Sequence, residues 1–189
     1  MVYDSAATRR RLIEAAVFEF SEYGVMGARV DRIAERAQAN KRAIYMYFES
    51  KEGLFAAAFE DRIRDFHESV RFDESDLAGY AGRLFDKFED APDTRRMTLW
   101  YHLEQSVAHI PVPLIQASTR SEIEAIRRAQ VNGIIPTTYE PATLLGLIRS
   151  IALTWHTQVP QLHDAKTVSR DEKRRVIEQT VHSLLSPPA

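Results

Sequence analysis

Apolar residues recur at three- and four-residue spacing along almost the whole chain of 189 residues. This spacing places them on one face of an α-helix, whereas a half-buried strand would require strict alternation. The chain contains only 7 Gly and 8 Pro, residues that are frequent in the many turns of β-proteins. The pattern predicts an all-α fold of about nine helices without a convincing strand. The expected helices lie at about 5–23, 30–37, 40–48, 50–70, 77–88, 92–107, 114–131 and 142–158, with a last one that includes 176–185.

Several classes of protein are excluded by composition. Cysteine is absent and no His-x-x-x-His pair occurs, so we expect neither a metal site nor another cofactor. The most apolar stretch, 144–148, ends at Arg149, far short of the ~20 residues of a membrane span. Near the N-terminus, Glu14, Glu19 and Glu22 interrupt the apolar positions, so no secretory segment is expected. The chain is expected to be a cytoplasmic protein that does not enter a membrane.

Positive charge is concentrated in one segment, although the whole chain carries a net charge of −2. Residues 29–51 contain six Lys or Arg and three Asp or Glu, and 6 − 3 gives +3. Residues 54–189 contain 16 cations and 19 acids, and 16 − 19 gives −3. A small basic patch on an acidic body is the electrostatic pattern of a protein with a local nucleic-acid interface.

The basic segment also has the pattern of a helix-turn-helix. Two short helices are expected on either side of Gln38, and Asn40 is a good N-cap for the second. Lys41 and Arg42 occupy the first turn of that helix, where they can reach guanine O6 and N7 or flanking phosphates in a major groove. Tyr47 projects differently from the neighbouring apolar residues and could give its hydroxyl to a phosphate.

The segments RRRLIEAAVFEFSEYG and ARVDRIAERAQANKRAIYMYFESKEGLF resemble the DNA-binding domain of the TetR/AcrR family of bacterial transcriptional repressors. Ile33-Ala34 and the run from Tyr45 to Leu54 keep the spacing of the family motif over three helices. The resemblance implies a helix-turn-helix domain at 1–53 and a helical ligand-binding and dimerisation domain at 54–189. Residues that match the family's DNA contacts are Asn40, Lys41, Arg42, Tyr45, Tyr47 and Lys51.

Three positions depart from the family pattern. Gln38 stands where a Gly is usual, so a residue with a Cβ must adopt the left-handed turn conformation. Arg29 replaces a Ser or Thr that commonly caps the second helix; it cannot cap, but it could reach a phosphate. Arg42 and Ala43 replace the more usual Gly-Thr pair, so the resemblance does not imply which base sequence is read.

For the remainder of the chain, the resemblance implies a small-molecule site and a dimer interface. Apolar and aromatic residues predict a lipophilic effector of modest size, oriented by Tyr101 or His102, although ordinary core packing is the alternative. The candidate ligand-binding residues are Phe66, Phe85, Phe88, Trp100, Tyr101, Leu103 and Trp155.

The helix at 142–158 is apolar almost all round, which fits burial both in its own domain and against a second copy. The alternative is that this helix and the last one are simply internal core. The candidate interface residues are Leu144, Ile148, Ile151, Ile177, Val181 and Leu184.

The predicted function is therefore a ligand-responsive repressor that binds a palindromic operator as a homodimer. One alternative is an all-α enzyme, for which Glu104 near His102 offers an acid and a base. No nucleophile motif or phosphate-binding loop supports it, and we expect no catalytic residues. Another alternative is a helical adaptor that has lost DNA binding. A salt-dependent shift with DNA fragments would separate a regulator from both.

Overall fold

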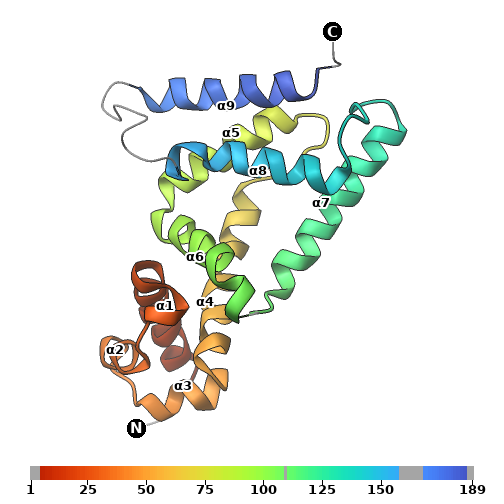
Figure 1. Cartoon of the computed structure of the whole chain (residues 1–189). Coiled ribbons are helices and arrows are strands. Elements are labelled where there is room, and N and C mark those ends of the chain that lie inside the picture. The colour runs from red at the N-terminus through yellow and green to blue at the C-terminus, as the bar shows by residue number, and fades with distance from the viewer. Residues whose placement is uncertain (1–4, 109, 158–167, 187–189) are drawn as a thin grey trace. The chain divides into compact units, whose positions relative to one another are not determined.

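A computed structural model describes residues 5–108, 110–157 and 168–186, which contain nine α-helices and no strand (Figure 1). The all-α prediction is therefore confirmed, and the helices follow the predicted order. No helix of the described ranges is long and apolar enough to cross a membrane. The helices are α1 (Ser5–Gly27), α2 (Val30–Arg36), α3 (Lys41–Phe48), α4 (Lys51–Ser69), α5 (Leu77–Asp90), α6 (Pro92–Ala108), α7 (Pro113–Val131), α8 (Pro141–Thr157) and α9 (Arg170–Leu184).

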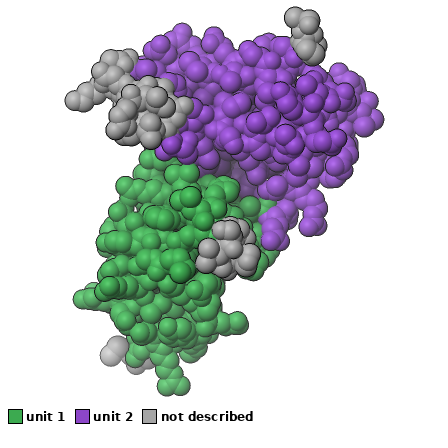
Figure 2. Space-filling model, in the orientation of Figure 1, with its two compact units in different colours: residues 1–65, 91–115 green, residues 66–90, 116–189 purple. Residues whose placement is uncertain are grey.

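The helices form two compact units, drawn in different colours in Figure 2. Unit 1 comprises 1–65 and 91–115, and unit 2 comprises 66–90 and 116–189. Most of α4 and all of α6 pack with the first three helices, so unit 1 extends beyond residue 53. The local pattern of α4 could not show this, since its apolar stripe is continuous through both units.

Unit 1 is built around aromatic side chains on α1 and α4. Phe20, Phe55 and Phe59 are fully buried, and the rings of Phe20 and Phe55 meet edge to face with centroids 5.2 Å apart. The predicted stripe on α1 is its buried face, since Leu12 and Ala16 are also completely covered. This core holds the three N-terminal helices in place.

Unit 2 has its own core, in which α5 packs against α8 and α9. Phe85 on α5, Ile148 on α8 and Val181 on α9 are all fully buried. Because each helix supplies an apolar stripe to this core, the three helices are fixed to one another by packing.

Candidate DNA-binding site

A break in α1 shapes the approach to the helix-turn-helix. Gly24 has φ 65°, and a Cβ placed there would lie 2.6 Å from an oxygen of Glu104 and 2.8 Å from the ring of Trp100. The Glu104 carboxylate accepts hydrogen bonds from the N–H groups of Val25 (2.7 Å) and Met26 (3.3 Å). Glu104, the acid of the enzyme alternative, therefore serves as an acceptor that attaches α6 to the end of α1.

The start of α2 is capped by a residue of α1. Arg29 occupies the N-cap position and makes no side-chain cap. Instead, the buried carboxylate of Glu19 accepts hydrogen bonds from the backbone N–H of Arg29 (2.9 Å) and from Nε of Arg32 (2.8 Å). The hydrogen bond with Glu19 raises the pKa of Arg32. A negative charge at this end of a helix is also favourable toward the helix dipole.

Gln38 adopts the left-handed conformation that its position requires. Its φ is 50°, as the replacement of Gly predicts. The turn is closed by a hydrogen bond from the N–H of Ala39 to the carbonyl of Ala34 (2.9 Å), and Nε of Arg11 donates to the carbonyl of Ala37 (3.1 Å). These bonds fix the geometry between α2 and α3.

Helix α3 has one buried face and one exposed face. Its N-cap is Asn40, whose side chain accepts the N–H of Arg42 at 2.8 Å, as the sequence predicts. Ala43, Ile44 and Phe48 are buried against unit 1. The opposite face, where Arg42 lies, is open to solvent.

Most of the predicted DNA contacts are available at the surface. Arg29, Asn40 and Arg42 are exposed, as is half of the Tyr45 side chain. Lys41 is also exposed, and its Nζ lies 2.8 Å from a carboxylate oxygen of Asp31.

Lys51 and Tyr47 are less accessible than the other predicted contacts. Nζ of Lys51, a half-buried residue, donates to the carbonyl of Ala28 at 3.4 Å. The Tyr47 hydroxyl is buried and finds no hydrogen-bond partner among the described residues. The ring of Tyr47 lies on the packed side of α3, 6.1 Å from that of Phe48, and its contact with a phosphate stays a prediction.

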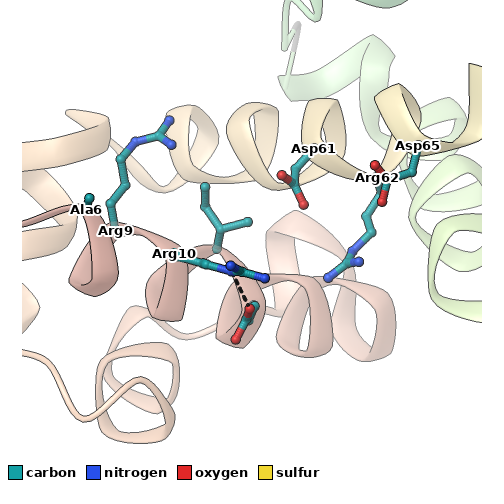
Figure 3. Close-up of a pocket in the computed structure, with 8 residues that line it drawn as sticks. Ala6, Arg9, Arg10, Asp61, Arg62 and Asp65 are labelled. Atoms are coloured by element: carbon teal, nitrogen blue, oxygen red, sulfur yellow. Dashed lines mark hydrogen bonds and ion pairs between the residues drawn. The ribbon is translucent and has the colours of Figure 1, made fainter. Parts of the chain in front are cut away.

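A groove of about 420 Å³ lies between the N-terminal part of α1 and α4 (Figure 3). Its charged groups are balanced, because α1 and α4 together supply three arginines and three carboxylates. Nε of Arg10 lies 3.1 Å from a carboxylate oxygen of Glu14 on the same helix. Such a lining suits neither an apolar effector nor a phosphate. The lining residues are Ala6, Arg9, Arg10, Ile13, Glu14, Asp61, Arg62 and Asp65.

The predicted ligand-binding residues fall in different units. Trp100, Tyr101 and Leu103 belong to unit 1. Nε1 of Trp100 donates to the carbonyl of Ser21 (3.2 Å), and the ring of Tyr101 lies 5.2 Å from that of Phe59. Leu103 is 70% exposed. In unit 1, therefore, two of these side chains take part in packing and the third is open to solvent.

The other four candidates belong to unit 2. The rings of Phe66 and Phe88 lie 4.8 Å apart, and Phe85 stacks on His156 at 5.7 Å. Trp155 is half-buried at the edge of the same core. Unit 2 thus brings together Phe66, Phe85, Phe88 and Trp155, but not the remaining three.

A polar cluster that sequence analysis did not find lies inside unit 2. The buried carboxylate of Glu122 on α7 accepts hydrogen bonds from the Tyr80 hydroxyl (3.2 Å) and from Arg149 on α8 (2.9 Å). Burial raises the pKa of Tyr80 and lowers the pKa of His67, whose Nε2 lies 3.1 Å from the hydroxyl of Ser118. These residues are far apart in the sequence, so no local pattern could have predicted the cluster.

The predicted dimer residues also separate into two groups. Leu144, Ile148, Ile177 and Val181 are buried in the core of their own unit, because their side chains point between α5, α8 and α9. Within the single chain these four residues belong to the internal core, and their part in a dimer interface stays a prediction. Ile151 and Leu184 are only partly buried and keep some exposed surface.

The sequence and the fold were compared with known proteins. Residues 12–58 match the family described as "Bacterial regulatory proteins, tetR family", and residues 76–182 match "Tetracyclin repressor-like, C-terminal domain". The HTH-type transcriptional repressor SCO4008 of Streptomyces coelicolor is 37% identical over 160 residues, which are 84% of this chain and 83% of that protein.

Solved structures agree with this result. SCO4942 of Streptomyces coelicolor, solved as a candidate transcriptional regulator, is 35% identical with a TM-score of 0.79, over 96% of this chain and 99% of its own. The regulator FadR of Bacillus subtilis, solved in complex with stearoyl-CoA, shares the fold with a TM-score of 0.68 at 18% identity, over 95% of this chain and 99% of its own. The proteins compared are regulators of transcription rather than enzymes.

Proposed function

Because this chain belongs to the TetR family of bacterial transcriptional regulators, we propose that it represses transcription as a homodimer that binds an inverted-repeat operator and leaves it when a small apolar effector binds. The observation that carries the proposal is the exposed face of α3. Arg42 lies on that face at the first turn, while Ala43, Ile44 and Phe48 anchor the opposite face. One face of this short helix packs on unit 1, and the other face is exposed and begins with cations. Such a helix suits insertion into a major groove.

Positive charge around α3 supports a DNA partner. Lys41 and Arg42 precede Lys51 at the start of α4, and Arg29 lies at the start of α2. A guanidinium can make a bidentate contact to guanine, whereas the ammonium groups suit phosphates. Arg42 is therefore proposed to read a base, and Arg29, Lys41 and Lys51 to bind the backbone.

A homodimer is proposed because each chain carries a single α3 helix and an inverted repeat presents two half-sites. Such half-sites lie about one DNA turn, or a multiple of it, apart. Ile151 on α8 and Val176 and Leu184 on α9 keep apolar surface exposed or partly exposed. A second copy that covered this surface would remove it from water.

The effector is proposed to bind in unit 2. The apolar core of this unit contains Phe66, Phe85, Phe88 and Trp155, and the Glu122–Arg149 pair supplies polar groups that could orient a ligand. FadR of Bacillus subtilis was solved with stearoyl-CoA, so a protein of this fold can hold a ligand with a long apolar chain. The chain is proposed to act in the bacterial cytoplasm, where its operator would lie.

Selection of bound duplexes from a random DNA pool tests the function directly. We expect enrichment of one inverted repeat and an affinity that falls steeply with salt. Sedimentation of the complex should give two chains per duplex. Failure to enrich any sequence, with the folded protein at low salt, would contradict the proposal and favour the adaptor that has lost DNA binding.

A further inference from the structure

One methionine stands apart on the surface of α3. Met46 is 64% exposed, whereas Met97 in the core of unit 1 is fully buried. The exposed side chain of Met46 adds little to the packing that stabilises the domain. The thioether of Met46 lies on the outward face of the helix that is proposed to bind DNA, where it is free to contact a partner outside the chain.

Helical geometry places Met46 beside Arg42. At 100° per residue, the two side chains point within about 40° of each other, and residues four apart are neighbours on a helix surface. Both are exposed, on the side of α3 that faces away from the buried Ile44 and Phe48. Four residues advance about 6 Å along the helix, less than two base-pair steps of DNA at about 3.4 Å each. A helix that brings Arg42 to one base pair thus brings Met46 to a neighbouring one.

The chemical character of the Met46 side chain limits which groups on a base it can recognise. Its side chain has no hydrogen-bond donor and only a weak acceptor, so it distinguishes bases by apolar contact. In the major groove of unmodified DNA, the one apolar group at a base edge is the C5-methyl of thymine. We propose that Met46 reads a thymine methyl group next to the base pair contacted by Arg42. This inference rests on the proposed function, because it assumes that α3 enters a major groove.

Uracil scanning tests the contact. The operator selected from the random pool is resynthesised with each thymine in turn replaced by deoxyuridine, which removes the methyl group and keeps every hydrogen-bonding group. For the wild-type protein we expect affinity to fall about threefold to tenfold at one thymine per half-site, the size expected for losing one buried methyl group. Met46→Ala should bind the thymine and uracil duplexes equally, and Met46→Leu, which keeps apolar surface, should retain the difference.

A matched control is Met26→Ala, which shortens another exposed methionine (66%) on α1 rather than on α3 and should leave uracil sensitivity unchanged. If Met46→Ala keeps the full uracil effect, or if no thymine is sensitive in the wild type, the inference is wrong while operator binding still supports the proposed function.

A further series replaces each cytosine with 5-methylcytosine. Tighter binding in that series without any uracil effect would assign the methyl group to a modified cytosine and overturn the thymine assignment.

Discussion

The carboxylate of Glu19, on α1, accepts a 2.9 Å hydrogen bond from the backbone N–H of Arg29, at the start of α2. A helix N-terminus leaves several N–H groups without intrahelical partners, and a Ser or Thr at the N-cap normally satisfies one of them. Here the cap comes from ten residues earlier in the chain. The contact satisfies the N–H of Arg29 itself, although the Arg29 side chain makes no cap.

We predict that Glu19→Ala destabilises unit 1. The N–H of Arg29 would lose its acceptor at a site where Glu19 is only 4% exposed, and an unsatisfied buried group costs about 1–3 kcal/mol. The melting temperature, followed by circular dichroism, should fall by about 2–4 °C per kcal/mol. Glu14→Ala is the control, because Glu14 is an exposed partner of Arg10 and its loss should change little. Equal melting temperatures for the two variants would show that the Glu19 cap contributes nothing.

Local patterns predicted the helices well, because caps and apolar stripes are local features. Asn40 caps α3 through its side chain, and Ser50 accepts the N–H of Gly53 at 2.9 Å at the start of α4. The left-handed φ of Gln38 follows from its place in the turn between α2 and α3, where a Gly is usual. Each of these features depends on residues at most four positions apart.

Contacts between distant segments could not be predicted in this way. Glu104 binds Val25 across 79 residues, and Glu122 accepts a hydrogen bond from Tyr80 across 42. No spacing rule joins such pairs, because only the packed fold brings them together. For the same reason, the sequence pattern does not separate dimer residues from core residues: a fully apolar helix face is equally consistent with an interface and with an internal core.

Lys51→Ala should weaken binding to every DNA sequence by a similar factor. Nζ of Lys51 carries its charge at the start of α4, where backbone N–H groups also favour a phosphate. Loss of one phosphate contact should reduce the slope of log K against log salt by about 0.9. Fluorescence anisotropy over a range of salt concentrations would measure this slope, with Lys87→Ala in unit 2 as the control. An unchanged slope would remove Lys51 from the phosphate contacts.

Arg42→Ala should instead act on one base pair. If its guanidinium makes a bidentate contact to guanine, the variant should lose about 1–3 kcal/mol on the selected operator and much less on a duplex already changed at that pair. Because Arg42 is exposed and the N-cap of α3 uses only its backbone N–H, folding should be preserved. Competition binding with single-substitution duplexes identifies the pair. A uniform loss on all duplexes would make Arg42 a phosphate contact.

The proposed dimer is tested by adding charge to partly buried and to fully buried positions. Ile151→Glu with Leu184→Glu should leave the chain folded but split the dimer, because two carboxylates would be forced into an apolar interface. Sedimentation velocity would show the change, and Ile134→Glu, at an exposed position outside α8 and α9, is the control. A double variant that stays dimeric would place the interface elsewhere.

Ile148→Glu should behave differently from the double variant of Ile151 and Leu184. Its side chain is fully buried within unit 2, so an unpaired carboxylate there should cost several kcal/mol and unfold the chain rather than divide it. Circular dichroism distinguishes the two outcomes. A folded monomer from Ile148→Glu would mean that this residue faces a second copy after all.

Tryptophan fluorescence tests where the effector binds, because the two indoles lie in different units. Trp100 belongs to unit 1 and donates its N–H to Ser21, whereas Trp155 belongs to unit 2 with Nζ of Lys173 5.6 Å from its ring. If the effector occupies unit 2, apolar compounds that bind should change the emission of Trp155. Trp155→Phe should therefore abolish most of the signal, and Trp100→Phe should retain it.

The same compounds must also act on DNA binding if they are effectors. To lower operator affinity a hundredfold, a compound needs about 2.7 kcal/mol of preference for the state that does not bind DNA. By reciprocity, saturating operator should weaken compound binding by the same factor, which the emission of Trp155 can measure in the Trp100→Phe background. Compounds that change Trp155 emission but leave operator affinity unchanged would show a ligand site without a switch.

A signal that persists in Trp155→Phe and vanishes in Trp100→Phe would instead place the site in unit 1. It would then lie beside the end of α1, to which Trp100 and Glu104 are hydrogen-bonded.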